Sequence, residues 1–179
     1  MLQHICLKKK GDIVVTIGMA HCNITSLTNT QIVCDLAANS AGSHQVKVYK
    51  ISEGNSNANV EYTYSLTSAG LSANEGSIGG GLVLVITGSG FSANTDVKIC
   101  NRKCVYKANT FNSYSCVLPS AEVKDADSTC AVSVTENGMS ASGSFTYRLS
   151  LTPTLTSVSP LRGGTGGGTL LTITGSGFP

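Results

Sequence analysis

Hydrophobic and polar residues alternate along this chain in short runs, which turn residues interrupt at intervals of roughly eight to twelve positions. In the best-defined stretch the runs predict six strands, at residues 82–87, 96–100, 104–106, 114–118, 130–135 and 144–148. Glu136-Asn137-Gly138 predicts a hairpin turn with positive φ between the last two. No window keeps the 3.6-residue period of an amphipathic helix. The pattern therefore predicts an all-β fold in which six or seven short strands form a small β-sandwich.

The same pattern returns along the chain. GGGLVLVITGSGF at residues 79–91 reappears as GGGTLLTITGSGF at residues 166–178, and YTYSL at residues 62–66 reappears as FTYRL at residues 145–149. These spacings indicate a repeating unit of about 85 residues. We predict an unmatched leader at 1–10, an N-terminally truncated unit at 11–67, a complete unit at 68–150 and the opening strand of a further unit at 151–179.

The chain is expected to be a window from a longer tandem array, and the truncated first unit has a predictable weakness. Without its opening strand it would expose a sheet edge and part of its core. We therefore expect the isolated fragment to be marginally stable or to aggregate.

Three short segments need an interpretation of their own. Residues 13–20 follow a basic run, but polar residues interrupt them, so we predict a strand rather than a signal peptide. Gly79–Gly81 precede a strand rather than a helix, which predicts a turn and not a phosphate-binding loop. Residues 151–157 are expected to be a short linker. No apolar run approaches the roughly 18 residues of a membrane-spanning helix.

Charge argues against a nucleic-acid partner. Charged residues make up 12% of the chain and the net charge is +2, whereas a nucleic-acid surface needs clustered Lys and Arg. The basic run Lys8–Lys10 lies at the extreme terminus and is expected to be a solvated tail.

A longer motif resembles the IPT/TIG family of immunoglobulin-like domains, which plexins, Met-type receptors and some transcription factors share. It consists of Ser-Pro, a glycine-rich turn, L-x-I-x-G-x-G-F, V-x-I, two cysteines and a closing F-x-Y. Ser159-Pro160 and residues 163–178 match its first half, and residues 79–147 match the rest, although Leu71–Asn74 replace Ser-Pro there. The resemblance implies tandem Ig-like β-sandwiches, one complete and two partial.

Two cysteine pairs occupy equivalent positions of the repeat. Cys22 and Cys34 have the same spacing as Cys104 and Cys116, so we predict a disulfide in each unit. In the chain-entropy treatment each would stabilise its unit by roughly 3 kcal/mol. The alternative is buried, reduced thiols.

A second pair is specific to the complete unit. Cys100 and Cys130 stand where the first unit has Gly18 and His44. Because both positions change together, we predict that they are in contact and form a Cys100–Cys130 disulfide. The alternative is a zinc site made of the four cysteines of this unit, but only Cys100 and Cys104 have the close spacing that zinc sites favour. We expect no metal and no cofactor.

Asn23-Ile24-Thr25 is the one N-glycosylation sequon, and beside a disulfide it is expected to carry a glycan at Asn23. Cys6 is left over and expected to be unpaired. The histidines His4, His21 and His44 lie in no arrangement that would activate a nucleophile. Glu122, Asp125 and Asp127 cluster in one loop, which we expect to be solvated rather than to bind calcium. No catalytic constellation is present, so we expect no enzyme.

These observations favour a non-catalytic structural and binding segment of an extracellular receptor array. The resemblance implies a place outside the cell, with any membrane anchor outside this fragment, and protein partners that bind through loops or edge strands. One alternative is an intracellular TIG domain that contacts DNA or dimerises, for which Arg102, Lys103 and Lys107 are the candidate residues. A second is an accessory sandwich that binds carbohydrate.

Overall fold

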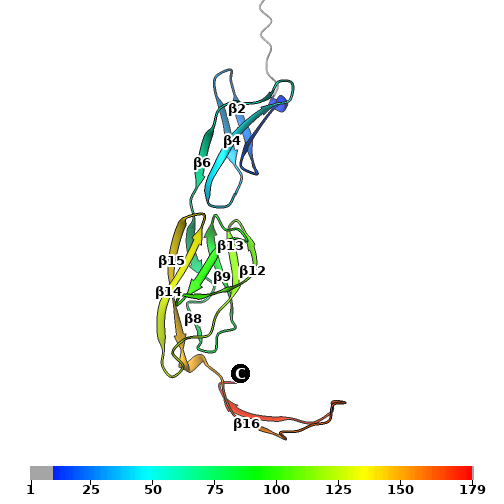
Figure 1. Ribbon diagram of the computed structural model, residues 1–179, viewed down its shortest axis with the longest axis vertical. Coiled ribbons are helices and arrows are strands. Elements are labelled where there is room, and N and C mark those ends of the chain that lie inside the picture. The colour runs from blue at the N-terminus through cyan, green and yellow to red at the C-terminus, as the bar shows by residue number, and fades with distance from the viewer. Residues whose placement is uncertain (1–9, 179) are drawn as a thin grey trace, which may run out of the picture.

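A computed structural model describes residues 10–178, and Figure 1 shows three β-rich parts arranged one after another along a long axis. Besides strands, the described part of the chain forms two short 3₁₀ helices. Neither has the length or the apolar character that crossing a bilayer would require. Cys6 and His4, for which predictions were made, lie outside the described residues.

The first part is a single antiparallel sheet that follows η1 (Lys10–Asp12). Its strands are β1 (Ile13–Ile17), β2 (Ala20–Leu27), β3 (Ile32–Leu36), β4 (Gly42–Lys50), β5 (Gly54–Asn55) and β6 (Val60–Tyr64). Their order is β3-β2-β1-β4-β5, and β6 pairs with β4. The strand expected at residues 13–20 ends earlier, at Ile17. Gly18 has a φ of 58°, a value that L side chains rarely adopt, and it turns the chain into β2.

The middle part is a two-sheet sandwich. Its strands are β7 (Thr67–Leu71), β8 (Glu75–Ser77), β9 (Val83–Ser89), β10 (Asp96–Ile99), β11 (Arg102–Lys103), β12 (Val105–Thr110), β13 (Ser113–Val117), β14 (Ser128–Glu136) and β15 (Met139–Arg148). One sheet has the order β11-β10-β14-β15-β8 and the other β12-β13-β9-β7. All six predicted strands are present, and the hairpin turn has positive φ at Asn137 and Gly138, at 46° and 79°. The prediction of an Ig-like sandwich is confirmed.

The core of this sandwich lies between its two sheets. Its largest side chains are less than 2% exposed and come from both sheets and from the segment after β9: Tyr114, Tyr147, Phe91, Phe145, Leu84 and Ile86. Buried positions alternate with outward ones along β9, β10, β13 and β14, so both inner faces supply interdigitating side chains. Ala41 and Leu66 also belong to this core, although both precede β7 in the sequence.

The third part is a hairpin that follows η2 (Leu149–Leu151). It consists of β16 (Thr154–Ser159) and β17 (Thr172–Ser176). The prediction of a linker over residues 151–157 is therefore half wrong, because residues 154–157 pair with β17.

The hairpin repeats the geometry of β7 and β9. Ser68 pairs with Gly88, and Leu155 pairs with Gly175 in the same manner, each next to a register shift. A Cβ at either glycine would fall on the carbonyl oxygen of the opposite strand, that of Thr67 or Thr154. The glycine in ITGSG therefore lets two strand backbones approach closely.

Candidate functional site

The six cysteines expected to form disulfides are joined in those three pairs. Cys22–Cys34 and Cys104–Cys116 have the same Cα–Cα distance of 5.4 Å and the same sequence separation of 12 residues. Cys104 and Cys116 are both 0% exposed, so this bridge is part of the core of the middle sandwich. The pairing leaves no four-cysteine zinc site in this unit.

The Cys100–Cys130 bridge joins the end of β10 to β14 across a Cα–Cα distance of 5.2 Å. At the equivalent place in the first part, a Cβ on Gly18 would lie 2.8 Å from Nδ1 of His44. The Nε2 atom of His44 lies 2.9 Å from the carbonyl oxygen of Ser40. The same contact is thus made by a disulfide in one unit and by an imidazole packed on a glycine in the other.

The first and middle parts meet at Ala41. Its backbone N–H donates to the carbonyl of Gly90 at 2.8 Å, and its own carbonyl accepts from Nδ2 of Asn137 at 2.8 Å. Gly90 has a φ of 89°, and a Cβ there would lie 2.8 Å from that of Ala41. Ala41 is therefore held from two sides by loops of the middle sandwich.

The carboxylate of Glu136 supports this junction from within the sandwich. Glu136 is 3% exposed, and its oxygens accept from Ser92 Oγ at 2.8 Å and from Thr95 Oγ1 at 2.5 Å. It also accepts from Nδ2 of Asn137 at 3.3 Å. Because a buried carboxylate needs several donors, these bonds fix the turn that carries Asn137.

A second junction leads from β15 towards the hairpin. Arg148 donates from Nε to Glu75 at 2.9 Å and from Nη1 to Asp127 at 3.1 Å. Asp127 also accepts from the backbone N–H of Leu149 at 2.7 Å. The Leu149 N–H bond and the Arg148 guanidinium together lower the pKa of Asp127, and the side-chain bonds to Glu75 and Asp127 raise the pKa of Arg148.

Asp127 has a structural role within the solvated acidic loop. Glu122, Asp125 and Asp127 are all exposed, as expected, and Asp127 also anchors the start of η2. Within the described residues, no group of three or more His, Cys, Asp or Glu side chains could hold a metal ion. His21 is exposed on β2.

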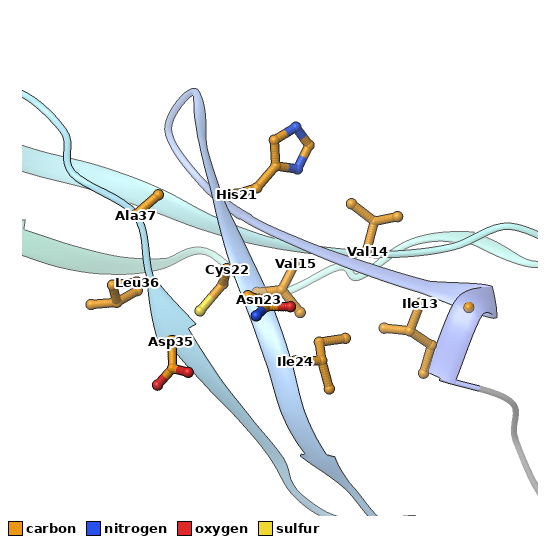
Figure 2. A pocket seen from close by; sticks show the side chains of 11 residues that line it. Ile13, Val14, Val15, His21, Cys22, Asn23, Ile24, Asp35, Leu36 and Ala37 are labelled. Carbon is orange, nitrogen blue, oxygen red and sulfur yellow. The ribbon is translucent and has the colours of Figure 1, made fainter.

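Apolar hollows lie at the interior of the first part. β2 pairs with β1 only at its beginning and with β3 over the rest of its length, so β1 diverges from the β2–β3 pair. Figure 2 shows Ile13, Val15 and Ile24 at the hollow between them. A second hollow shares Val15, Cys22 and Leu36 with the first and reaches Tyr62 on β6.

This interior is less covered than that of the middle sandwich. Tyr62 is 42% exposed, whereas the equivalent Phe145 is 0% exposed. Ile32 and Cys34 on β3 are half-buried, whereas the equivalent Tyr114 and Cys116 on β13 are at most 1% exposed. In the middle sandwich β9 pairs with β13 and covers that side of the core. Among residues 10–178, β3 has no such neighbour on its outer edge.

Asn23 lies on the outer face of β2, opposite Asp35 of β3. Its side chain is exposed while its neighbours Cys22 and Ile24 are buried. The sequon therefore faces solvent, and occupancy by a glycan stays a prediction.

Three comparisons place the chain among known proteins. The family model described as "IPT/TIG domain" matches residues 6–64, 67–147 and 153–179. Mouse fibrocystin-L is 39% identical over 174 residues, and human fibrocystin-L is 35% identical over 173 residues; these matches cover 94% and 93% of the chain. The chain spans only 4% of the length of either relative. A structure of the plexin A4 full extracellular region is 23% identical with a TM-score of 0.47, over 82% of this chain and 13% of that one.

Proposed function

This chain belongs to the IPT/TIG domain family, and we propose that it forms a non-catalytic structural and binding segment in the extracellular IPT/TIG array of a large cell-surface protein. The observation that carries the proposal is the junction at Ala41. Two hydrogen bonds and a close approach to Gly90 hold consecutive units end to end. A free hinge would need no such contacts, so they support the proposal that the units are spaced as parts of a rod.

We propose the unit division given by the repeat, with a leader at 1–10 and units at 11–67, 68–150 and 151–179. The family model matches three consecutive stretches, which supports an array. Similarity to fibrocystin-L supports a large parent protein, because the chain spans 4% of it.

The extracellular placement is supported by the three disulfides, since such bonds persist in oxidising compartments. A glycan at Asn23 would follow from that placement, because the side chain is exposed there. Partner proteins would bind through exposed loops or edge strands. A membrane connection would come from an anchor outside this segment.

The intracellular alternative is less well supported. Of its three basic candidates, Arg102 donates from Nη1 to the backbone carbonyl of Ser120 at 2.7 Å and to its hydroxyl at 3.2 Å. That guanidinium is therefore used to tie β11 to the loop after β13. Two exposed lysines remain, which is few for a phosphate-binding surface.

The test compares the chain expressed with a secretion signal and the same chain expressed in the cytosol. Free thiols are alkylated before a non-reducing peptide map, and Asn23→Gln serves as the control for glycosylation. We expect the three disulfides in the secreted form and a glycosidase-sensitive mass that Asn23→Gln removes. A secreted, folded chain in which all six thiols are free would overturn the extracellular proposal. Salt-dependent binding of duplex DNA by the cytosolic form would then favour the alternative.

A further inference from the structure

The two disulfides of the middle sandwich differ in how far they are buried. Cys104 and Cys116 are each 0% exposed, whereas Cys100 and Cys130 are half-buried and pack at the margin of the same core. Thiol–disulfide exchange requires a thiolate to reach one sulfur of the bond, so its rate depends on access. Of the two bridges, Cys100–Cys130 is therefore the one that a thiol in solution can reach.

The backbone of Cys100 is held in an unusual conformation. Cys100 has a φ of 51° and Asn101 a φ of 62°, and these two residues form the turn from β10 into β11. The left-handed region is unfavourable for a residue with a side chain, because its Cβ crowds the backbone. The first unit has Gly18 at the position of Cys100, with a φ of 58°. Among the cysteines of residues 10–178, Cys100 alone has a positive φ. Cleavage of its bridge would let this backbone relax.

The two sulfurs of the bridge also differ in the charge around them. Arg102 and Lys103, both exposed, form β11 directly after the turn that begins at Cys100. Cys130 lies on β14 between Thr129 and Ala131, which carry no charge. Cations beside a cysteine stabilise its thiolate, and a stabilised thiolate departs faster in exchange. Cys100 is therefore the better leaving group of the pair.

We propose that Cys100–Cys130 is a site of thiol–disulfide exchange with an extracellular dithiol. A thiolate of the dithiol attacks Sγ of Cys130, and the S–S bond breaks with its electron pair on the sulfur of Cys100, which takes up a proton. The second thiol of the dithiol then displaces Cys130 from the mixed disulfide. The dithiol is oxidised to a disulfide, and both cysteines end as thiols after a two-electron reduction. This proposal rests on the proposed extracellular placement only because the bridge has to form first.

The exchange would act on β11, the two-residue strand at the edge of its sheet. β11 pairs with β10 over two residue pairs and with no other strand among residues 10–178. Reduction would free the turn at Cys100, and with it the bonds from Arg102 to Ser120. The buried Cys104–Cys116 bridge would still hold the segment after β11 to β13. We therefore expect β11 to open locally while the sandwich stays closed.

The first experiment treats the oxidised full chain with a limiting amount of dithiothreitol. The chain carries Cys6→Ser, so that every remaining cysteine has a partner, and a non-reducing peptide map first verifies the three disulfides. Samples are quenched with an alkylating reagent over time, and mass spectrometry follows the labelling of each cysteine. We expect Cys100 and Cys130 to be labelled at least about tenfold faster than Cys104 and Cys116. Equal rates would overturn the exchange site and leave the extracellular placement intact, whereas absence of the Cys100–Cys130 bridge from the first map would overturn both.

A second experiment identifies the sulfur that leaves. β-Mercaptoethanol, an uncharged monothiol, replaces the dithiol so that the mixed disulfide persists. We expect the adduct on Cys130 and the alkylated thiol on Cys100. Lys103→Gln should slow this exchange by about threefold or more because it removes a cation, whereas Lys47→Gln, which removes an exposed lysine from β4, should not. Adducts divided equally between the two cysteines, or equal slowing by Lys47→Gln, would refute the assigned direction of attack.

Hydrogen exchange of the selectively reduced chain tests the local opening. Peptides that contain β11 should exchange fully while peptides from β9 and β13 in the same sample still retain protected amides. The oxidised chain is the control, and its β11 peptides should exchange more slowly. Simultaneous loss of protection in all of these peptides would show global unfolding and would contradict a local effect of the exchange.

Discussion

The two disulfides of the middle sandwich allow loop length and burial to be weighed against each other. Cys100–Cys130 closes 30 residues and Cys104–Cys116 closes 12. The chain-entropy treatment assigns them about 3.6 and about 2.8 kcal/mol respectively. By loop length alone, loss of Cys100–Cys130 would be the more damaging.

Burial reverses that order. Cys104 and Cys116 are 0% exposed, whereas Cys100 and Cys130 are only half-buried. Replacing a buried cysteine by alanine removes a sulfur from a packed core, at a cost of about 1 kcal/mol for each position. We therefore expect Cys104→Ala/Cys116→Ala to cost about 5 kcal/mol, and Cys100→Ala/Cys130→Ala about 4 kcal/mol.

The assay is hydrogen exchange of the full chain in increasing urea, followed by mass spectrometry of peptides from β9 and β13. The control variant Cys100→Gly/Cys130→His installs the residues of the first unit. It should stay within about 1 kcal/mol of the alanine pair, because an imidazole restores packing but not the cross-link. The reasoning fails if this variant regains the stability of the original chain, or if loss of Cys100–Cys130 is the costlier change.

Three further predictions concern single side chains. Asn137→Gly keeps the positive φ of the turn but loses the donor to Ala41, so it should cost about 1 kcal/mol and broaden the distribution of inter-unit distances seen by X-ray scattering. The Tyr147 hydroxyl donates to the Pro119 carbonyl at 2.7 Å, and burial raises the pKa of Tyr147 to about 12. The neutral phenol therefore stabilises the fold below the unfolded-state pKa of about 10, and this contribution to stability is lost as the pH rises through 12. Tyr147→Phe should therefore cost about 1 kcal/mol at pH 7 and flatten alkaline unfolding curves, and an unchanged curve would contradict the assignment. Gly88→Ala should cost about 3 kcal/mol in the same exchange assay, because the new methyl group would meet the backbone carbonyl of the adjacent strand.

Strands and the hairpin turn could be predicted from the sequence because their signals are local. Alternation of apolar and polar residues sets which face is buried, and an Asn-Gly pair supplies the positive φ of a two-residue turn. The prediction of a linker at residues 151–157 was wrong over residues 154–157 for a related reason. Threonine and serine suit an exposed strand as well as a loop, and pairing with β17 decided the outcome.

The junctions could not be predicted in the same way. Ala41 and Gly90 lie in loops of different units, and neither residue type signals a contact with a distant loop. Asp127 is similar, because its partners Arg148 and Leu149 follow it by a whole hairpin. Polar residues in loops show their roles only when tertiary structure brings the loops together.

Repetition inside one chain supplied the information that local patterns lack. Cys100 and Cys130 differ from Gly18 and His44 at two positions far apart in sequence, and both pairs are in contact in the structure. A disulfide needs two cysteines and an imidazole needs space beside it, so neither position can change alone without leaving a free thiol or a clash. The same comparison shows which strand would lie beside β3, an edge without a partner strand among residues 10–178. Units of one chain thus constrain one another, because a position that one unit buries must also be covered in a second unit with the same pattern.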